Sequence, residues 1–203
     1  RLDWLRRFDH MQQHTAQHVL SQAFWQLFQA ETVGFHLGEQ VVTIDLAGAE
    51  LDAAKVEQAE ALTNAMLRNK LPVRCQEVTA DALPAMRLRK LPQVEADIRL
   101  IEITGFDLCP CGGTHVRDLG EIGLLKVVGS EKKRGNLRIA FLAGQRAYRD
   151  YGTRHSQLVS LSALLSEPIE NVVSAVERML SRMNELERER GRLREQVLTL
   201  EAK

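Results

Sequence analysis

Residues 109–115 read CPCGGTH. Two cysteines flank a proline, and two glycines, a threonine and a histidine follow. Consecutive glycines permit a tight turn, which can aim the side chains of Cys111 and His115 inward together. This stretch alone leaves two interpretations open. It is either a glycine turn with a buried cysteine, or one half of a metal site whose other half lies elsewhere in the chain.

Residues 14–18 read HTAQH and lie inside a predicted helix. A spacing of four places His14 and His18 on one face, with Cβ atoms about 5–6 Å apart. Alone, such a pair is more often a half-buried core face than a ligand pair. The zinc-peptidase motif is excluded because it places a glutamate after the first histidine, where this chain has Thr15. Together the two pairs offer three nitrogens and one sulfur, a set that suits tetrahedral zinc.

The chain before residue 144 alternates helical and extended patterns in irregular order. Apolar residues at spacings of three and four predict helices over about residues 3–29 and 52–70, the second ending before Pro72. The stretch VGFHLGEQ, residues 33–40, breaks the first pattern with two glycines and is interpreted as a loop. Strands are predicted over about residues 40–48, 73–79, 97–106, 123–129 and 136–142, the last two as a hairpin with a charged loop. Residues 80–95 are expected to form a short helix and an irregular loop.

After Gly144 the pattern is helical to the end of the chain. A helix is predicted over about residues 145–165, Pro168 interrupts it, and a second helix follows. Within residues 169–200, positions alternating three and four apart are apolar except Arg190, which indicates a coiled coil over about four heptads. The alternative is a helix that packs on its own domain. We therefore expect an α+β domain over residues 1–144, with long helices on an antiparallel sheet, and a helical arm over residues 145–203.

Composition narrows the class of protein. The formal net charge is zero, so any nucleic-acid partner must be bound by local basic patches. Three cysteines, with two only two residues apart, predict a reducing compartment, and we expect the cytoplasm. We expect no membrane span and no secretory leader. Because the sequence opens with Arg1 in mid-pattern, we interpret it as a piece of a longer protein.

Three stretches carry a resemblance to a known family: RRFDHMQQHTAQHVLSQAF, CPCGGTHVRDLGEIG and LRIAFLAGQRAY. Over about residues 4–145 the chain resembles the editing domain of alanyl-tRNA synthetases and their free-standing relatives, the AlaX alanyl-tRNA editing proteins. The HxxxH and CxxxH pairs, about a hundred residues apart, are similar to the zinc signature of that family. The later helices resemble, more loosely, the connector to a further C-terminal domain.

The resemblance implies an aminoacyl-tRNA deacylase. It would hydrolyse the ester that links serine, and glycine as a second substrate, to the 3′ end of the alanine tRNA. The implied zinc ligands are His14, His18, Cys111 and His115, and the implied pocket residues are Thr15 and Thr114. The N–H groups of Gly112 and Gly113 are candidates for receiving the developing oxyanion. Thr15 is also a candidate partner for the serine hydroxyl, because an alanine substrate would leave that partner unpaired. A helix threonine that bonds its own backbone is an equal alternative.

Basic residues in two clusters are candidate phosphate contacts, although for either cluster alone a solvated loop is the better interpretation. They are Arg87, Arg89, Lys132, Lys133, Arg134 and Arg138. Two further readings stay open: an editing domain acting within a full synthetase, and a non-catalytic module in which zinc only joins helix to loop. A homodimer through residues 169–200 is the expected assembly.

Overall fold

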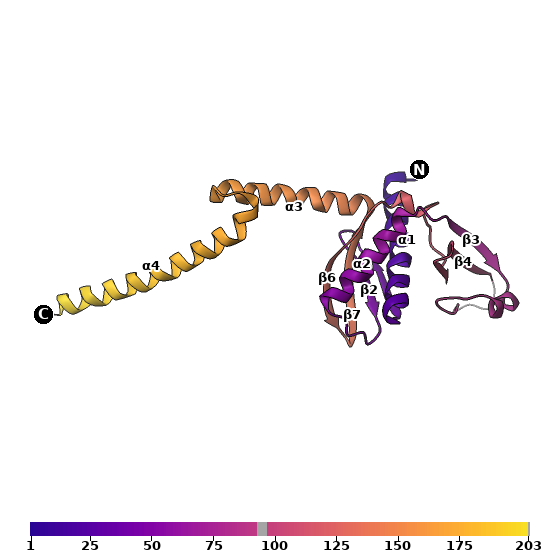
Figure 1. Cartoon of the computed structure of the whole chain (residues 1–203), viewed down its shortest axis with the longest axis horizontal. Coiled ribbons are helices and arrows are strands. Elements are labelled where there is room, and N and C mark those ends of the chain that lie inside the picture. Colours follow the sequence, from indigo (N-terminus) through magenta and orange to yellow (C-terminus); the bar gives the residue numbers. More distant parts are fainter. Residues whose placement is uncertain (93–96, 203) are drawn as a thin grey trace. The chain divides into compact units, whose positions relative to one another are not determined.

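The computed structural model describes residues 1–92 and 97–202, which form two compact units, Arg1–Arg149 and Asp150–Lys203. In its described residues the first unit combines helices with two antiparallel sheets, and the second is helical (Figure 1). The α+β class and the C-terminal helical arm expected from the sequence are confirmed. The boundary expected after residue 144 between two domains stays a prediction.

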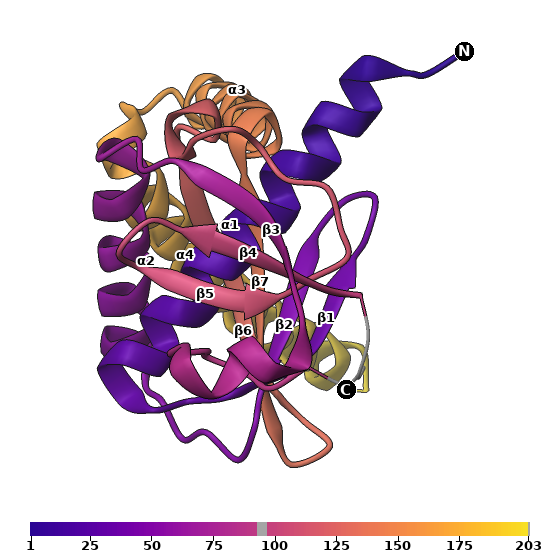
Figure 2. The same cartoon turned by 90° about the vertical axis from the view of Figure 1, so that its right-hand side faces the viewer.

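Helix α1 runs from Trp4 to Phe28 and confirms the first predicted helix. The side chain of Asp3 caps its N-terminus by accepting a hydrogen bond of 3.1 Å from the backbone N–H of Arg6. Residues 15–21 are buried without interruption, so α1 is covered on more than one side. It contacts helix α2 (Ala53–Arg68), strand β1 (Thr32–Leu37) and strand β5 (Asp107–Pro110) (Figure 2). This central position places the middle of α1 between the two sheets.

The larger sheet has four antiparallel strands in the order β1-β2-β7-β6. Strands β2 (Val42–Leu46) and β7 (Asn136–Ala143) form its centre and confirm two predicted strands. The core between this sheet and helices α1 and α2 includes Phe24, Ile44, Ile139 and Phe141, all fully buried. Strand β6 spans Leu125–Lys133, so most of the predicted charged loop is strand. Only Arg134 and Gly135, both with positive φ, make the turn, as two-residue hairpins require.

Strand β1, Thr32–Leu37, overturns the interpretation of residues 33–40 as a loop. It pairs with β2 at the sheet edge, and the register shifts between Thr32 and Gly34. A Cβ atom at Gly34 would lie 2.9 Å from a carboxylate oxygen of Asp45, so glycine is needed where the strands approach closely. The glycine that suggested a break therefore belongs to an irregular edge strand.

A second sheet has the order β3-β4-β5 and lies in front of α1 in Figure 2. Strands β3 (Val73–Val78) and β4 (Ile98–Ile103) confirm two predictions. The strand predicted through residue 106 is shorter, because Gly105, with φ of 72°, reverses the chain into β5 (Asp107–Pro110). The short helix expected after residue 80 is the 3-10 turn η1, Ala80–Ala85. Residues 93–95 of the predicted loop lie outside the described residues.

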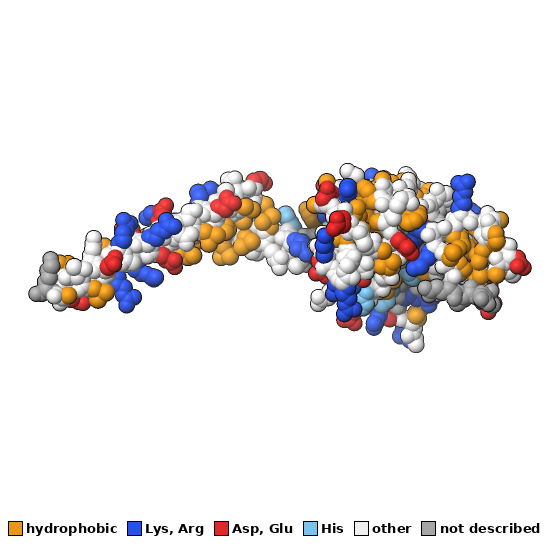
Figure 3. Space-filling model, turned by 90° about the horizontal axis from the view of Figure 1, so that it is seen from below, with side chains coloured by type: hydrophobic (Ala, Val, Ile, Leu, Met, Phe, Trp, Pro, Cys, Tyr) orange, Lys and Arg blue, Asp and Glu red, His pale blue; other side chains and the backbone are white. Residues whose placement is uncertain are grey.

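The helical arm consists of α3 (Gly144–Leu165), which begins in the first unit, the turn η3 (Ile169–Asn171) and α4 (Val172–Glu201). Pro168 lies at the break between the helices, as predicted. Apolar side chains along α4 are mixed with charged ones and reach the surface (Figure 3). Met179, Met183, Leu193 and Val197 are each at least half exposed. Among the described helices, none is both long and apolar enough to cross a membrane.

Candidate metal centre

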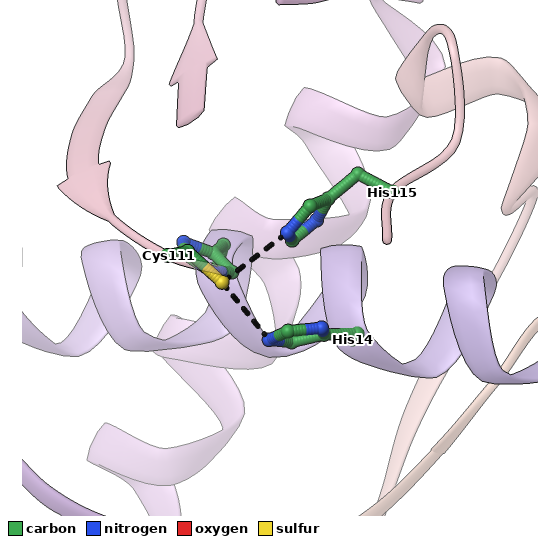
Figure 4. A group of neighbouring side chains, drawn as sticks. His14, Cys111 and His115 are labelled. Carbon is green, nitrogen blue, oxygen red and sulfur yellow. Dashed lines mark hydrogen bonds between the residues drawn. The ribbon is translucent and has the colours of Figure 1, made fainter. Parts of the chain in front are cut away.

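Four potential metal ligands from two distant parts of the chain converge in the first unit. His14 and His18 lie one turn apart on α1, and Cys111 and His115 lie in the segment that follows β5. Figure 4 shows the side chains of His14, Cys111 and His115 gathered together. One donor atom from each residue lies within 4.8 Å of the others. The sulfur of Cys111 lies 3.4 Å from Nε2 of His14 and 3.4 Å from Nε2 of His115. Histidine side chains reach the surface of this unit on the face seen in Figure 3.

The loop that carries Cys111 is tied to strand β4 by Arg99. The backbone N–H of Cys111 donates to the carbonyl of Arg99 at 3.0 Å. The Arg99 guanidinium in turn donates to the carbonyls of Cys111 and Gly113 at 2.6 and 2.7 Å. Hydrogen bonds from a charged donor are stronger than neutral ones, so Arg99 fixes the path of the loop.

The two glycines of the loop are not equivalent. A Cβ atom at Gly113 would overlap the imidazole of His14, whereas a Cβ at Gly112 would meet no atom within 4 Å. The N–H of Gly113 donates to the sulfur of Cys111 at 3.4 Å. Gly113 therefore serves the close packing of the loop on α1. Gly112 and Thr114 are exposed beside the cluster.

The electrostatic surroundings keep the cysteine and one histidine in their ligand forms. Burial alone would raise the pKa of the Cys111 thiol, but hydrogen bonds from His115, His14 and His18 outweigh it and lower the pKa to about 3. Burial lowers the pKa of His115 to about 4, because the charged imidazolium loses hydration. At neutral pH Cys111 is a thiolate and His115 is neutral, as metal ligands must be.

His18 is buried and faces a carboxylate that the sequence analysis did not identify. Its Nδ1 lies 3.3 Å from Oδ2 of Asp107, which in turn accepts hydrogen bonds of 2.8 and 3.0 Å from Arg89. Burial disfavours the charged forms of both Asp107 and His18, but their hydrogen bonds outweigh it. The pKa of Asp107 is therefore lowered and the pKa of His18 is raised. One signal was available: Asp107, Cys109 and Cys111 alternate along an extended segment, so their side chains share a face.

Thr15 and Arg89, expected to contact substrate and phosphate, are instead hydrogen-bonded within the protein. Thr15 is fully buried, and its hydroxyl donates to the carbonyl of Met11 at 2.9 Å. The same oxygen accepts from the N–H of Val116 at 3.2 Å and lies 3.1 Å from Nδ1 of His115. The hydroxyl is thus saturated within the protein and orients His115. Arg89 is engaged with Asp107, with 9% of its side chain exposed.

The other candidate phosphate contacts lie at the surface. Arg87 is exposed in the segment after η1, and Lys132, Lys133 and Arg134 are exposed near the tip of the β6–β7 hairpin. Lys132 reaches Glu50 at 3.0 Å, an exposed pair of little energetic weight. Arg138 donates two hydrogen bonds of 2.7 and 2.8 Å to Asp45, so these guanidinium N–H groups are already paired within the protein.

Two further features flank the cluster. A cavity of about 450 Å³ opens beside Cys111 and Gly112, and Lys90, Leu91 and Arg99 belong to its wall. On β1, the ring of Phe35 stacks on the imidazole of His14, with centroids 5.2 Å apart and an angle of 12° between planes. Because Phe35 lies in a segment that was interpreted as a loop, sequence reasoning gave no signal for this contact.

Comparison with known proteins agrees with the motifs. Residues 98–140 match the family model described as the threonyl and alanyl tRNA synthetase second additional domain. The chain is 37% identical over 200 residues to the alanyl-tRNA editing protein AlaX-L of Pyrococcus horikoshii, covering 93% of this chain and 49% of the relative. It is 33% identical over 192 residues to the alanyl-tRNA editing protein Aarsd1-B of Xenopus laevis, covering 93% of this chain and 47% of the relative.

The chain also matches a synthetase. It is 28% identical over 213 residues to the alanine–tRNA ligase of Pyrococcus furiosus, covering 98% of this chain and 23% of the ligase. The chain spans about half the length of the curated editing proteins it matches. The resemblance drawn from the motifs is thereby confirmed: most of the chain is similar to the alanyl-tRNA editing proteins.

Proposed function

We propose that this chain holds a zinc ion with His14, His18, Cys111 and His115 and hydrolyses mischarged alanine tRNA, removing serine and, as a second substrate, glycine. The observation that carries the proposal is the convergence of these four donors, one of which, Cys111, borders a cavity. The names of its relatives, alanyl-tRNA editing proteins and an alanine–tRNA ligase, support the choice of substrate.

The donor set fits zinc in both chemistry and spacing. Ligands at tetrahedral zinc lie about 2.0–2.3 Å from the ion, which places neighbouring donors about 3.3–3.8 Å apart. The two sulfur–nitrogen separations of 3.4 Å fall in this range. The four donors lie within 4.8 Å of one another, so the more distant ones would have to move closer when an ion binds. A thiolate with imidazoles favours zinc over calcium or magnesium, which prefer oxygen ligands.

The cavity supports a catalytic role over a purely structural one. A site that only joins helix to loop needs no adjacent space, whereas a deacylase must admit the terminal ribose and its aminoacyl group. The cavity of about 450 Å³ borders Cys111 itself and falls in the usual size range of ligand pockets. Lys90 in its wall offers a positive charge for a backbone phosphate of the tRNA 3′ end.

Bound zinc supplies Lewis acidity, which polarises an ester carbonyl or lowers the pKa of a water molecule. The chain's own groups would orient the ester. Gly112 and Thr114 are exposed residues beside the cluster. The backbone N–H of Gly112 is our candidate for receiving the developing oxyanion, and the side chain of Thr114 is our candidate for holding the aminoacyl group. Gly113 shapes the turn, because its N–H is directed at the cysteine sulfur.

Deacylation of alanine tRNA charged with serine, glycine or alanine tests this function. Protein loaded with zinc should release serine, with glycine slower and alanine spared, and a chelator should stop release until zinc is restored. Release that persists in metal-free protein would contradict the proposal. Replacing Thr114 with Val should slow release without loss of zinc. We do not propose Thr15 as the serine-selecting group, because its hydroxyl already has three partners within the protein.

A structural zinc site is the second candidate function, favoured by the number of ligands. Four protein donors complete a tetrahedral shell, which is typical of structural sites. This alternative predicts tight zinc binding, loss of fold on chelation and no deacylation of any charged tRNA. A domain acting within a longer synthetase would keep the deacylation chemistry, since the chain also matches an alanine–tRNA ligase.

Exposed cations are proposed to bind the tRNA backbone. Lys132, Lys133 and Arg134 lie near one hairpin tip, and Arg87 is exposed on another segment. Replacing the three hairpin residues with Ala should weaken tRNA binding and flatten its dependence on salt by about one unit of slope per lost contact. An unchanged slope would remove the hairpin from the interface.

Residues 169–200 are proposed to pair with a second copy of the chain. The apolar positions of α4 that follow the heptad are exposed, including Met183 at 50% and Leu193 at 55%. Replacing Met183 and Leu193 with Glu should reduce the mass measured by light scattering to that of a monomer. A mass equal to that of the unaltered chain would contradict the pairing.

A further inference from the structure

A buried ion pair lies directly behind one of the four candidate ligands. His18 comes from α1, Asp107 opens β5, and Arg89 lies in the segment after η1. The side chains of His18, Asp107 and Arg89 are 4%, 0% and 9% exposed. Three separate segments therefore contribute one contact each to a chain of charged and polar groups that ends at the metal cluster.

The carboxylate of Asp107 is saturated by two partners. Both guanidinium bonds from Arg89 reach it, at 2.8 Å to Oδ1 and 3.0 Å to Oδ2, and Oδ2 also lies 3.3 Å from Nδ1 of His18. A buried carboxylate without partners costs several kcal/mol, so the planar fork of Arg89 is what allows a charge here. The backbone N–H of Arg89 also donates to the carbonyl of Leu108 at 2.9 Å, which anchors the arginine to β5.

The contact dictates which nitrogen of His18 faces the cluster. When Nδ1 points to a carboxylate, the ring proton resides on Nδ1. The lone pair of Nε2 is then free to bind a metal ion. Carboxylates placed in this way behind metal-bound histidines fix the tautomer and raise the basicity of the ligand. We propose that Asp107, held by Arg89, is a positioning residue that fixes His18 for zinc and thereby sets the metal affinity of the site. This inference rests on the proposed zinc site.

His115 provides an internal comparison. Its Nδ1 faces the hydroxyl of Thr15 at 3.1 Å, a neutral partner, whereas the Nδ1 of His18 faces a charge. The charged partner should contribute more to metal affinity, because hydrogen bonds that involve an ionised group are about twice as strong as neutral ones. The order of effects expected on zinc affinity is therefore Asp107 before Thr15.

The test measures zinc affinity of the full chain by competition with a chelating dye. Asp107→Asn keeps the shape of the side chain and removes its charge, and zinc affinity should fall about 10- to 100-fold. Cobalt-substituted protein gives a second readout: the sulfur-to-metal band of Cys111 should persist while the ligand-field bands shift. Asp107→Glu should restore part of the lost affinity.

Asp9→Asn is the matched control. Asp9 lies on the same helix and accepts bonds of 2.9 and 2.7 Å from Arg146 in a comparable ion pair, but it faces no ligand imidazole. The Asp9→Asn chain should bind zinc with an affinity within about two-fold of that of the unaltered chain. If Asp107→Asn binds zinc as tightly as the unaltered chain, or if Asp9→Asn weakens it equally, the inference is wrong.

Arg89→Lys decides the case if Asp107→Asn does not fold. Lysine keeps the charge but cannot form both guanidinium bonds to Asp107, so we expect zinc affinity to fall below that of the unaltered chain; unaltered affinity would overturn the inference. Because the readout is metal affinity, failure of the inference is distinct from failure of the proposed function. An unaltered chain that binds zinc but releases no serine would reject the function and leave the positioning role intact.

Discussion

The two halves of the candidate metal centre share a spacing but not a physical origin. HTAQH holds His14 and His18 by the geometry of the helix, which places residues four apart on one face without further help. CGGTH holds Cys111 and His115 with no helix, through the Arg99 bonds to the loop carbonyls and the close fit of Gly113 on His14. The helical pair is held by local backbone geometry, whereas the loop pair is held by tertiary contacts. Substitutions distant in sequence should therefore disturb the loop pair more.

The largest expected effect comes from removing a donor from either half. His14→Ala in the helix and Cys111→Ala in the loop should each abolish zinc retention and serine release together. Zinc content of the purified protein and the deacylation assay measure both properties on one sample. Retention of a full equivalent of zinc in either variant would show that the four donors do not share one ion.

The loop glycines give the sharpest test of the difference between the halves. Gly113→Ala would place a methyl group in the His14 ring, and overpacking costs about 1–3 kcal/mol, or about 5- to 150-fold in zinc affinity. Gly112→Ala meets no atom within 4 Å and should bind zinc like the unaltered chain. Equal affinities in the two variants would mean that the loop does not pack on α1 as described.

Arg99→Met should weaken the site without touching any ligand. Two charge-assisted bonds to the loop carbonyls would be lost, at about 1.5–3 kcal/mol each, shared between fold stability and zinc affinity. We expect a lower zinc affinity and a lower melting temperature than in the unaltered chain. Arg117→Met, an exposed change in the same segment, is the control, and an equal effect there would argue against a specific clamp.

Thr15→Val, a substitution on α1, tests the smallest of the expected contributions to zinc affinity. The change removes the hydroxyl between His115 and the N–H of Val116, which is worth about 1 kcal/mol, or about five-fold in zinc affinity. Thr15→Ser should restore it. The preference for serine over alanine should stay unaltered in both variants; a change in that preference would return Thr15 to the substrate pocket.

The thiolate offers a test in metal-free protein. The pKa of Cys111 is lowered from 9.0 to about 3, so ultraviolet absorbance of a thiolate should persist between these values and vanish as the pH falls toward 3. For an acid with a lowered pKa, the associated stability is complete above the ordinary value and is lost on acidification through the lowered one. Burial raises the pKa of Cys109 to about 11, so Cys111→Ser alone should remove the signal. A thiolate that forms only near pH 9 would contradict this environment.

The sequence predicted most elements and the identity of the cluster, for reasons that differ along the chain. The pair on α1 follows from helical periodicity, and the cysteine-histidine pair from its glycine turn and the family resemblance. The support around the ligands was not predictable, because Asp107, Arg89 and Arg99 act through contacts between segments distant in sequence. Arg89 looked like a surface cation in a basic cluster, and only the fold shows that it is paired with Asp107.

Strand β1 was missed for a related reason. Gly34 normally marks a break, but here it allows close approach to Asp45 at the edge of the sheet. Local sequence cannot distinguish a glycine that ends a strand from one that fits a neighbour. Phe35, which that strand places against His14, was missed with it.

X-ray absorption spectroscopy of the zinc-loaded chain tests the central claim most directly, because it counts the atoms around the ion. The account predicts one sulfur at about 2.3 Å and nitrogens at about 2.0–2.1 Å from the bound ion. A shell without sulfur, or one with two sulfurs that enlists Cys109, would contradict the site.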